Sequence, residues 1–465
     1  MTVRTLAGLA AFNAVMLAGG AGVLFALRGW RSWAELVRLG GFAYLLGVAA
    51  TGVLYTFELV VGVPFTFATI VATGAALTLA GVGIGRRLGH RLPPRPRQAR
   101  LPRLSWPGAV FAAAAVVYLE ALFRSGRLAA LEEYDAWAFW VPKAKAIYLF
   151  HGLDLGFFRS LPGPSYPPVV PALEAAAFHF MGSIDGVTLH LQFWFFFAGF
   201  LAAIGGLLAS RVPTLLLWPP LLLALLTPQI TGRALQPQAD LLLDELVGLA
   251  AVLVAIWLAE RRPWQLHAAT IVLAGAMLTK REGFLLTTCI VAAALVVTVR
   301  EARRAWPQLA LAGAGAALLS LPWRIWFEAH GLANDAPEAG GTGLFHNLDR
   351  AWPSFELTVR DLFGYPLWLA VAPLTVAAVV AALLAGRRAL PLYVGILLVF
   401  GVAGFTWITW AFPSLPITEN AAVNPVTRAV GSLVVASCGL VPLLLAAAWR
   451  SAAGRAGQHR SVEAA

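Results

Sequence analysis

The sequence predicts an all-α polytopic membrane protein with about 13 transmembrane helices, and three observations lead to this fold class. Of the 465 residues, 59% are hydrophobic and only 12% are charged, whereas an ordinary soluble domain is about 25% charged. The mean hydropathy is +0.76. Apolar runs of about 20 residues, long enough to span a bilayer, recur along the chain. These observations exclude a soluble enzyme, a disordered chain and a disulfide-stapled secreted domain.

The hydropathy pattern predicts thirteen spans, whose ends are uncertain by a few residues. The first is too long and too poorly flanked for a cleaved signal peptide, since its basic residues, Arg28, Arg31 and Arg38, follow it. The predicted spans are 6–27, 41–61, 65–85, 106–123, 186–209, 213–229, 240–259, 265–279, 283–299, 308–327, 365–385, 390–411 and 427–448.

The net charge of +11 does not indicate a nucleic-acid partner, because the basic residues lie between apolar spans and not on one polar face. If the arginine-rich segment 86–105 is cytoplasmic, the cytoplasmic side holds 21 of the 34 basic residues and four of the 23 acidic ones. This bias follows the positive-inside rule. It places the N-terminus outside and the C-terminal tail inside. Arginine- and alanine-rich usage suggests a bacterial protein, so we expect the plasma (inner) membrane.

Loop lengths divide the chain into five parts. We expect a three-span N-terminal appendage at 1–85, a basic cytoplasmic linker at 86–105, and a catalytic module at 106–331 that includes the long outer loop 124–185. C-terminal spans and outer loops on the acceptor side follow at 332–450, and a cytoplasmic tail at 451–465. Within the long outer loop, Ala136–Phe150 and Pro168–Met181 are amphipathic and are expected to lie in the membrane interface with their aromatic sides toward lipid.

Acidic side chains gather at the outer ends of the predicted spans. Asp240 and Asp244 are four residues apart and therefore share one helix face. A carboxylate at the bilayer centre costs about 2.5–3.5 kcal/mol, so acids near spans need a structural or functional reason. For Glu120, pairing with Arg124 one helical turn later is the expected reason. The outer acids that could converge on one cavity are Glu132, Glu133, Asp135, Asp240, Asp244, Glu245 and Glu282.

Lysine is rare, and its positions point to phosphate. The chain has 31 arginines and three lysines, and all three lysines, Lys143, Lys145 and Lys280, fall on the predicted outer side. The compact ammonium of lysine interacts with a phosphate as a point charge, whereas the guanidinium of arginine is planar and binds a phosphate through two parallel hydrogen bonds. Neither the histidines nor Cys289 and Cys438 have metal-ligand spacing, so no metal site is predicted from them. A divalent cation held by the carboxylates is left open.

The ordered set of local sequences resembles the GT-C membrane glycosyltransferases, in particular the bacterial protein O-mannosyltransferases and aminoarabinose transferases. The resemblance covers about 106–331. It consists of an outer loop that opens with acids and tryptophan, two amphipathic helices, an acid at the start of a later span, and a Leu-Thr-Lys turn. The residues that carry it are Tyr134-Asp135-Ala136-Trp137, Trp140, Lys143, Lys145, Ser165-Tyr166-Pro167-Pro168, Gln238-Ala239-Asp240, Leu278-Thr279-Lys280, Leu321-Pro322-Trp323 and His330-Gly331.

The resemblance implies an inverting transferase that moves a sugar from a polyprenyl phosphate to an acceptor hydroxyl on the extracytoplasmic face. Asp135 matches the catalytic carboxylate, with Glu133 as the alternative, and Asp240 matches the acid of the second loop. Lys280, with Arg281 and Arg428, would bind the lipid phosphate, although the tyrosine that often follows the late arginine in relatives is absent. Further candidates for substrate contact are Lys143, Tyr166, Asp244 and His330. The acceptor would be a glycan, a lipid or a protein.

Two other functions share parts of this pattern. An oligosaccharide ligase or polymerase also has many spans and outer loops, but it usually carries its large loop late in the chain. A transporter of lipid-linked sugars would place paired charges near mid-membrane on broken helices and would often show internal repeats. Here the charges crowd the outer boundary and the sequence shows no repeat, which favours the transferase.

Overall fold

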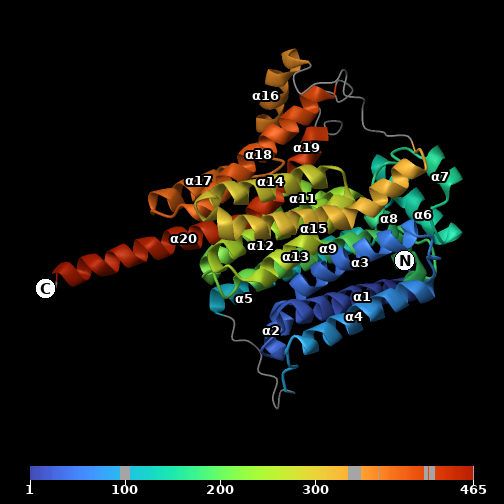
Figure 1. Ribbon diagram of the computed structural model, residues 1–465, viewed down its shortest axis with the longest axis horizontal. Coiled ribbons are helices and arrows are strands. Elements are labelled where there is room, and N and C mark those ends of the chain that lie inside the picture. Colours follow the sequence, from blue (N-terminus) through green and yellow to red (C-terminus); the bar gives the residue numbers. More distant parts are fainter. Residues whose placement is uncertain (95–104, 333–346, 365, 413–416, 418–424, 464–465) are drawn as a thin grey trace.

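The structure, a computed structural model, describes residues 1–94, 105–332, 347–364, 366–412, 417 and 425–463 (Figure 1). Within these ranges the chain forms helices and connecting segments and no strand. This confirms the predicted all-α class. Parts of the predicted linker 86–105, of the segment between the predicted spans 308–327 and 365–385, and of the segment between the predicted spans 390–411 and 427–448 lie outside the described residues.

Nine helical segments in the described part of the chain are long and apolar enough to cross a membrane. They confirm a multi-pass membrane protein. These are α1 (Val3–Arg28), α3 (Gly40–Val60), α4 (Phe67–Arg87), α5 (Trp106–Gly126), α9 (Gly186–Leu208), α12 (Ala239–Glu260), η2 with α15 (Val299–Ala329), α18 (Ala389–Ala411) and α19 with the first part of α20 (Pro425–Ala453).

Four of the thirteen predicted spans form shorter helices, so the count of thirteen stays a prediction. The predicted spans 213–229, 265–279, 283–299 and 365–385 correspond to α10 (Thr214–Leu226), α13 (Pro263–Thr279), α14 (Glu282–Val297) and α17 (Val371–Leu384). The remaining helices are α2 (Trp33–Arg38), η1 (Ala136–Trp140), α6 (Val141–Phe150), α7 (Leu155–Ser160), α8 (Val169–Met181), α11 (Pro228–Arg233), η3 (Leu348–Arg350) and α16 (Ala351–Leu362), while α19 is Pro425–Ala429 and α20 is Gly431–Glu463.

Helix α12 forms the centre of the bundle. Every residue from Ala239 to Leu258 is buried, because α12 packs against α9, α13, α14, α18 and α20. A helix that is apolar all round is stable only when neighbours cover it on all sides. The two helices α4 and α5, in contrast, leave most of their apolar surface uncovered by protein and therefore available to lipid.

The N-terminal helices pack into the bundle through α3, which contacts α9 and α13 as well as α1. A polar cluster inside the bundle joins three of these helices. The Asn13 amide of α1 donates to Gln192 Oε1 of α9 over 2.9 Å, and Tyr44 of α3 donates to Asn13 Oδ1 over 2.5 Å. Such contacts hold membrane helices together where lipid offers no partner for a polar group. The role of the first three spans as a separate appendage stays a prediction.

The helices of the long outer loop lie at the same end of the bundle as the N-terminus, opposite the C-terminus (Figure 1). Helix α8 was expected to lie in the membrane interface with one face in lipid, and this is wrong. It is buried along nearly its whole length, including Glu174, and packs against α1, α3 and α6. Its high apolar content reflects burial within protein, since a fully covered helix needs no lipid-facing side.

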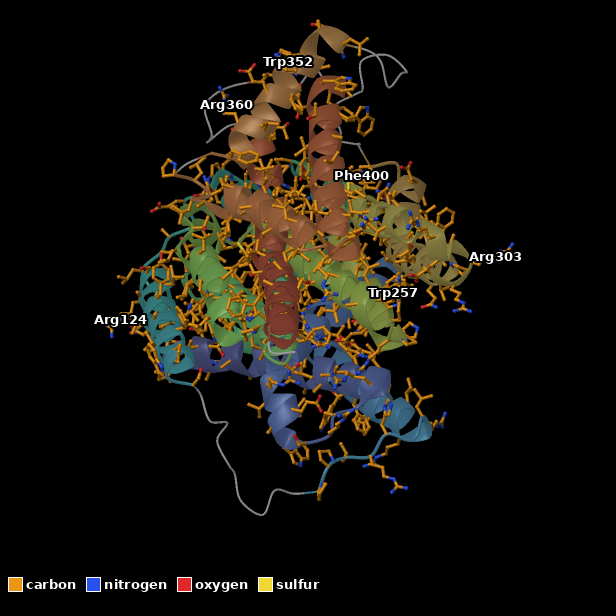
Figure 2. The ribbon with its side chains drawn as sticks, turned by 90° about the vertical axis from the view of Figure 1, so that its left-hand side faces the viewer. Arg124, Trp257, Arg303, Trp352, Arg360 and Phe400 are labelled. Carbon is orange, nitrogen blue, oxygen red and sulfur yellow. The ribbon has the colours of Figure 1, made fainter. Side chains whose placement is uncertain are left out.

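Two acids near spans find partners in the structure. Glu120 forms the expected ion pair with Arg124, which confirms that prediction. Figure 2 shows Arg124 pointing away from the bundle, so this pair lies on its periphery. Glu58, in the last turn of α3, accepts a hydrogen bond from Thr73 of α4.

Close packing of α1 on α3 depends on glycine and generates a first prediction. A Cβ atom on Gly47 would lie 1.9 Å from the Met16 carbonyl oxygen, which is backbone and cannot move alone. We expect Gly47→Leu to reduce the free energy of unfolding by about 1–3 kcal/mol, the usual cost of overpacking. Thermal unfolding of the detergent-solubilised protein measures this. Gly83→Leu on α4 is the control, because open space surrounds that position. Equal melting temperatures for both variants would contradict the packing argument.

Candidate active site

One cavity of about 490 Å³ joins a charged region to an apolar groove. The charged region combines residues from the outer loop, the α13–α14 turn and α19, which are far apart in the sequence. The groove lies between α14 and α18, which pack against each other. The residues on the cavity wall are Asp135, Phe139, Tyr166, Lys280, Arg281, Glu282, Phe284, Leu285, Thr288, Phe405, Trp407, Ile408, Thr409, Phe412, Pro425, Val426, Arg428 and Ala429.

Helix ends place the charged side chains. Asp135 immediately precedes the π-helical turn η1, and Asp240 lies in the first turn of α12. Lys280 is the residue that ends α13, and Arg428 lies in the short helix α19. Charges at helix ends avoid the cost of a position at mid-membrane, yet they can reach a common point when the ends meet. The spacing of these residues along the chain therefore does not reveal how close they are.

Arg428 bridges two carboxylates and so links the outer loop to α12. One of its terminal nitrogens, Nη1, pairs with Asp135 Oδ2, and the other, Nη2, lies 2.5 Å from Asp240 Oδ2. Asp240 Oδ1 in turn accepts from Lys280 Nζ over 2.9 Å, and Lys280 Nζ lies 3.0 Å from Glu282 Oε1. The result is a chain of alternating charges, which we call the charge chain: Asp135, Arg428, Asp240, Lys280 and Glu282.

Burial differs along the charge chain. The side chains of Asp240 and Lys280 are only 3% and 8% exposed, whereas those of Asp135 and Arg428 are 18% and 33% exposed. Buried charges are stable when they are paired and hydrogen-bonded, and Asp240 satisfies this through both of its oxygens. Asp135, Arg428 and Glu282, which is 23% exposed, are therefore the members of this chain that a ligand can reach most easily.

The electrostatics around Lys280 keep a positive charge at the base of the cavity. Burial acts to lower the pKa of Lys280, but the carboxylates of Asp240 and Glu282 outweigh burial and hold this pKa above its ordinary value. Burial raises the pKa of Tyr166, so its phenol stays protonated and can donate a hydrogen bond. The Arg281 guanidinium lies 5.1 Å from the centre of the Tyr166 ring, a distance at which the two attract each other.

The α13–α14 turn is tight for a steric reason. A Cβ atom on Gly283 would lie 2.2 Å from the Ala276 carbonyl oxygen, so α14 can approach α13 only where glycine follows Glu282. This approach fixes Lys280 between Asp240 and Glu282. Gly283 is therefore part of what shapes the cavity, although it offers no chemical group.

The apolar groove takes its surface from aromatic and aliphatic side chains. Phe284 and Leu285 come from α14, and Phe405 and Ile408 come from α18. Among the described residues, no charged side chain lines this half of the cavity, whereas the other half contains three cations and two carboxylates. The cavity is therefore amphipathic, and a ligand that fills it needs an anionic or polar head and an apolar chain.

Several residues expected from the sequence do meet in this cavity. Asp135, Tyr166, Lys280, Arg281 and Arg428 all line it. Asp240 does not appear on its wall, but it contacts both Lys280 and Arg428 directly.

Other expected residues lie elsewhere. Glu133 accepts a hydrogen bond from Gln236 over 2.6 Å and lines a small neighbouring hollow of about 170 Å³. His330 lies off the cavity wall, where its Nδ1 contacts the Trp326 carbonyl oxygen at 2.7 Å. Lys143 was expected to contact substrate, and the structure corrects this. Its side chain is fully buried, donates to the Gly163 carbonyl and lies near three aromatic rings. Its contacts assign it to the packing of the outer loop.

Asp244 was also expected to contact substrate. In the structure it lies off the cavity wall and supports Arg428 indirectly, through Arg233. It lies 2.6 Å from Arg233 Nη1 and accepts from Ser432 over 2.5 Å. Arg233 Nη2 in turn donates to the carbonyl oxygens of Thr427 and Arg428, over 3.3 and 3.1 Å. The pair of Asp244 and Arg233 therefore holds the backbone of α19, from which the Arg428 side chain reaches the cavity.

Sequence reasoning missed Arg233 and the aromatic residues of α18. Arg233 lies in the short loop predicted between spans 213–229 and 240–259, where a charge is ordinary and gives no sign of a buried role. Phe405 and Trp407 of α18, and Phe412 directly after it, look like ordinary membrane-facing residues in the sequence. Glu282 was noticed as an outer acid, and its contact with Lys280 two residues earlier could have been expected from the tight turn.

No group of three or more His, Cys, Asp or Glu side chains within the described ranges is arranged to hold a metal ion.

The fold and the cavity together define a class of protein: a polytopic membrane protein with an amphipathic, charged cavity at one end of its bundle. Comparisons of the chain with family models, with curated proteins and with solved structures find no match.

The buried pair of Arg233 and Asp244 generates a second prediction. The two side chains are 5% and 3% exposed, so Asp244→Ala leaves an arginine buried without its carboxylate. We expect this change to reduce the free energy of unfolding by about 3–5 kcal/mol. Thermal unfolding in detergent measures the loss. Glu133→Gln is the control, because Glu133 is exposed and makes one hydrogen bond to a neutral amide. An Asp244→Ala variant as stable as the control would show that this pair does not hold α19.

Proposed function

We propose that this protein is an integral membrane glycosyltransferase. It would move a sugar from a polyprenyl-phosphate donor to an acceptor hydroxyl, on the side of the membrane to which the long loop and the N-terminus belong. The observation that carries the proposal is the single cavity in which a carboxylate, a cluster of cations and an apolar groove are continuous. The cations correspond to the donor phosphate, the apolar groove to the polyprenyl chain, and the carboxylate to the base that the reaction needs.

The cations suit the phosphate. Lys280, Arg281 and Arg428 reach the same cavity from two different elements, the α13–α14 turn and α19. A phosphate in this region would form an ion pair with the ammonium and accept paired hydrogen bonds from a guanidinium. These groups would stabilise the negative charge that grows on the leaving phosphate as its bond to the sugar breaks.

Asp135 suits the role of general base. Its side chain lines the cavity, is 18% exposed, and forms the end of the charge chain at which its partner Arg428 is itself accessible. In the proposed step, the acceptor oxygen forms a bond to the anomeric carbon from the face opposite the phosphate. The bond from that carbon to the phosphate oxygen breaks, and the proton of the acceptor hydroxyl passes to Asp135. The electron pair leaves on the lipid phosphate, and the anomeric centre inverts.

Arg428 connects the two ends of this reaction. In the structure its guanidinium contacts Asp135 through one nitrogen and Asp240 through the other. A donor phosphate near Lys280 would compete with these carboxylates for the same guanidinium. Binding of the donor would then weaken the hold of Arg428 on Asp135 and leave that carboxylate available to the acceptor hydroxyl.

The groove between α14 and α18 suits the polyprenyl chain. Its walls are apolar, and it begins next to the cations, so the head and the chain of one amphiphile can occupy both parts together. The charges collect at helix ends at one end of the bundle, which suits chemistry at the membrane surface better than passage of a polar solute through the middle.

The third prediction tests the base. We expect Asp135→Asn to lower the release of free polyprenyl phosphate by about 10²–10⁴-fold, because the amide cannot accept the acceptor proton. The assay supplies purified protein with a panel of polyprenyl-phosphate sugars and a membrane extract as the source of acceptors. Glu133→Gln, which removes a nearby carboxylate outside the cavity, is expected to keep near wild-type activity.

Two outcomes of this assay would contradict the proposal. Wild-type activity in Asp135→Asn together with loss in Glu133→Gln would assign the base to Glu133 instead. No release of polyprenyl phosphate by the wild-type protein from any donor would favour a ligase or a transporter of lipid-linked sugars.

The fourth prediction tests the groove. Thr288→Trp places an indole on the groove wall, and we expect it to raise KM for long-chain donors by about tenfold, since two or three methylene contacts are lost. A donor with a chain too short to enter the groove should not distinguish the variant from wild type. Val296→Trp is the control, because Val296 is exposed on the same helix outside the cavity. An equal effect on short and long donors would place the chain elsewhere.

A further inference from the structure

A second pocket lies at the other end of the bundle, and the proposed reaction does not use it. Its volume is about 730 Å³. It is formed where α1 ends, where α4 ends and where α13 begins. Figure 1 shows α2 and the end of α4 away from α6, α7 and α8, at the end that the charge bias predicts to be cytoplasmic. The residues on its wall are Ala26, Leu27, Arg28, Gly29, Trp30, Arg31, Ile84, Leu88, His90, Arg91, Arg262, Pro263, Trp264 and His267.

Positive charge in this pocket exceeds the negative charge around it. Of the residues that the structure describes, four arginines and no carboxylate line the wall. Glu35 neutralises Arg28, which lies 2.5 Å away, and its second oxygen accepts the backbone N–H of Arg31. The side chains of Arg31 and Arg91 have no acidic partner in the part of the chain that the structure describes, and both are exposed.

The fourth arginine is only weakly compensated. Arg262 Nε lies 3.6 Å from Glu260, but that carboxylate already accepts closer bonds from Arg211 and Gln265, over 2.6 and 2.8 Å. The pocket therefore retains uncompensated positive charge that an anion would neutralise.

Neighbouring groups hold the wall in place. Arg28 lies 5.0 Å from the centre of the Trp264 ring, and His90 Nδ1 lies 2.6 Å from the Phe25 carbonyl oxygen. Gly29 makes the bend after α1 with φ of +62°, where a side chain would be strained and would touch His90. The N-terminus of α13, which begins at Pro263, also faces this region, and its helix dipole adds partial positive charge. The arrangement is one that attracts a phosphate.

The apolar edge of the pocket distinguishes a lipid from a soluble phosphate. Ile84 and Leu88, at the end of α4, are 51% and 65% exposed and border the arginines directly. The surface of α4 above them is mostly uncovered by protein, so it is available to acyl chains. A soluble anion would use the arginines but would gain nothing from this apolar strip.

We propose that the pocket formed by Arg28, Arg31, Arg91 and Arg262 binds the phosphate headgroup of an anionic phospholipid, whose acyl chains lie along the exposed face of α4. Basic pockets between membrane helices on the cytoplasmic side suit such headgroups. The lipid would contact the ends of α1 and α4 and the start of α13 together. It would therefore stabilise the packing of the N-terminal helices on the rest of the bundle.

The fifth prediction compares lipid binding in two double variants. Arg31→Gln with Arg91→Gln removes two pocket charges that have no acidic partner. Arg303→Gln with Arg304→Gln removes the same charge from exposed positions on α15, which are not on the pocket wall, and Figure 2 shows Arg303 pointing away from the bundle. Purified protein in detergent is titrated with phosphatidylglycerol, and bound lipid is counted by native mass spectrometry. We expect binding to the pocket variant to be about 30-fold weaker than to wild type, since each arginine contributes to anionic-lipid attraction.

Further probes separate the lipid from other ligands and protect the test against misfolding. Phosphatidylcholine, which carries no net charge, is expected not to bind at the same concentrations. Inorganic phosphate is expected not to raise the melting temperature where phosphatidylglycerol does. Leu88→Glu, at an exposed position, should weaken phosphatidylglycerol binding while leaving the lipid-free melting temperature unchanged.

Three results would overturn the proposal. Equal loss of binding in both double variants would reduce the effect to general surface charge. Stabilisation by inorganic phosphate as strong as that by phosphatidylglycerol would make this a site for a soluble anion. Unaltered binding in both the pocket variant and Leu88→Glu would place the lipid elsewhere. None of these readouts depends on transferase activity, so the result stands apart from the proposed function.

Discussion

The two ion pairs of Arg428 are the interaction on which the candidate site depends. Asp240 begins the most deeply buried helix, and Asp135 belongs to the outer loop, so one guanidinium joins the centre of the bundle to its outer cover. Lys280 adds a third element through its contact with Asp240. Removal of Lys280 or Arg428 would leave the buried carboxylate of Asp240 with one cation fewer, and buried charges depend on such partners. The candidate site is for this reason a structural junction between the outer loop, α12 and the α13–α14 turn.

The surrounding bundle supplies what this junction needs. Arg233 and Asp244 hold the backbone of α19 at the carbonyl of Arg428, and Gly283 allows the α13–α14 turn to close beside Asp240. In lipid, each buried polar group must find its partner inside the protein. The same requirement explains the polar cluster of Asn13, Tyr44 and Gln192 between three helices. Polar contacts in this fold therefore occur in connected groups.

The two ends of the bundle differ in what surrounds their positive charge. At the end that carries the candidate site, carboxylates alternate with cations, and an apolar groove lies inside the protein between two helices. At the opposite end, arginines outnumber nearby acids, and the apolar surface faces lipid on α4. The first arrangement suits a ligand that must bind, react and leave. The second suits a resident lipid whose headgroup balances the charge.

The sequence alone determined the all-α membrane class, the pairing of Glu120 with Arg124 and the position of most outer acids near helix ends, because hydropathy and helical spacing are local properties. It could not decide which of those acids meet. Asp135 and Asp240 come together only through Arg428, which lies about 190 residues after Asp240, and such a contact depends on how helices pack. For the same reason Lys143 and Asp244 became buried structural residues, and α8 became covered by protein. The spacing of residues in the sequence determines which of them lie side by side on one helix, but only tertiary packing brings the ends of different helices together.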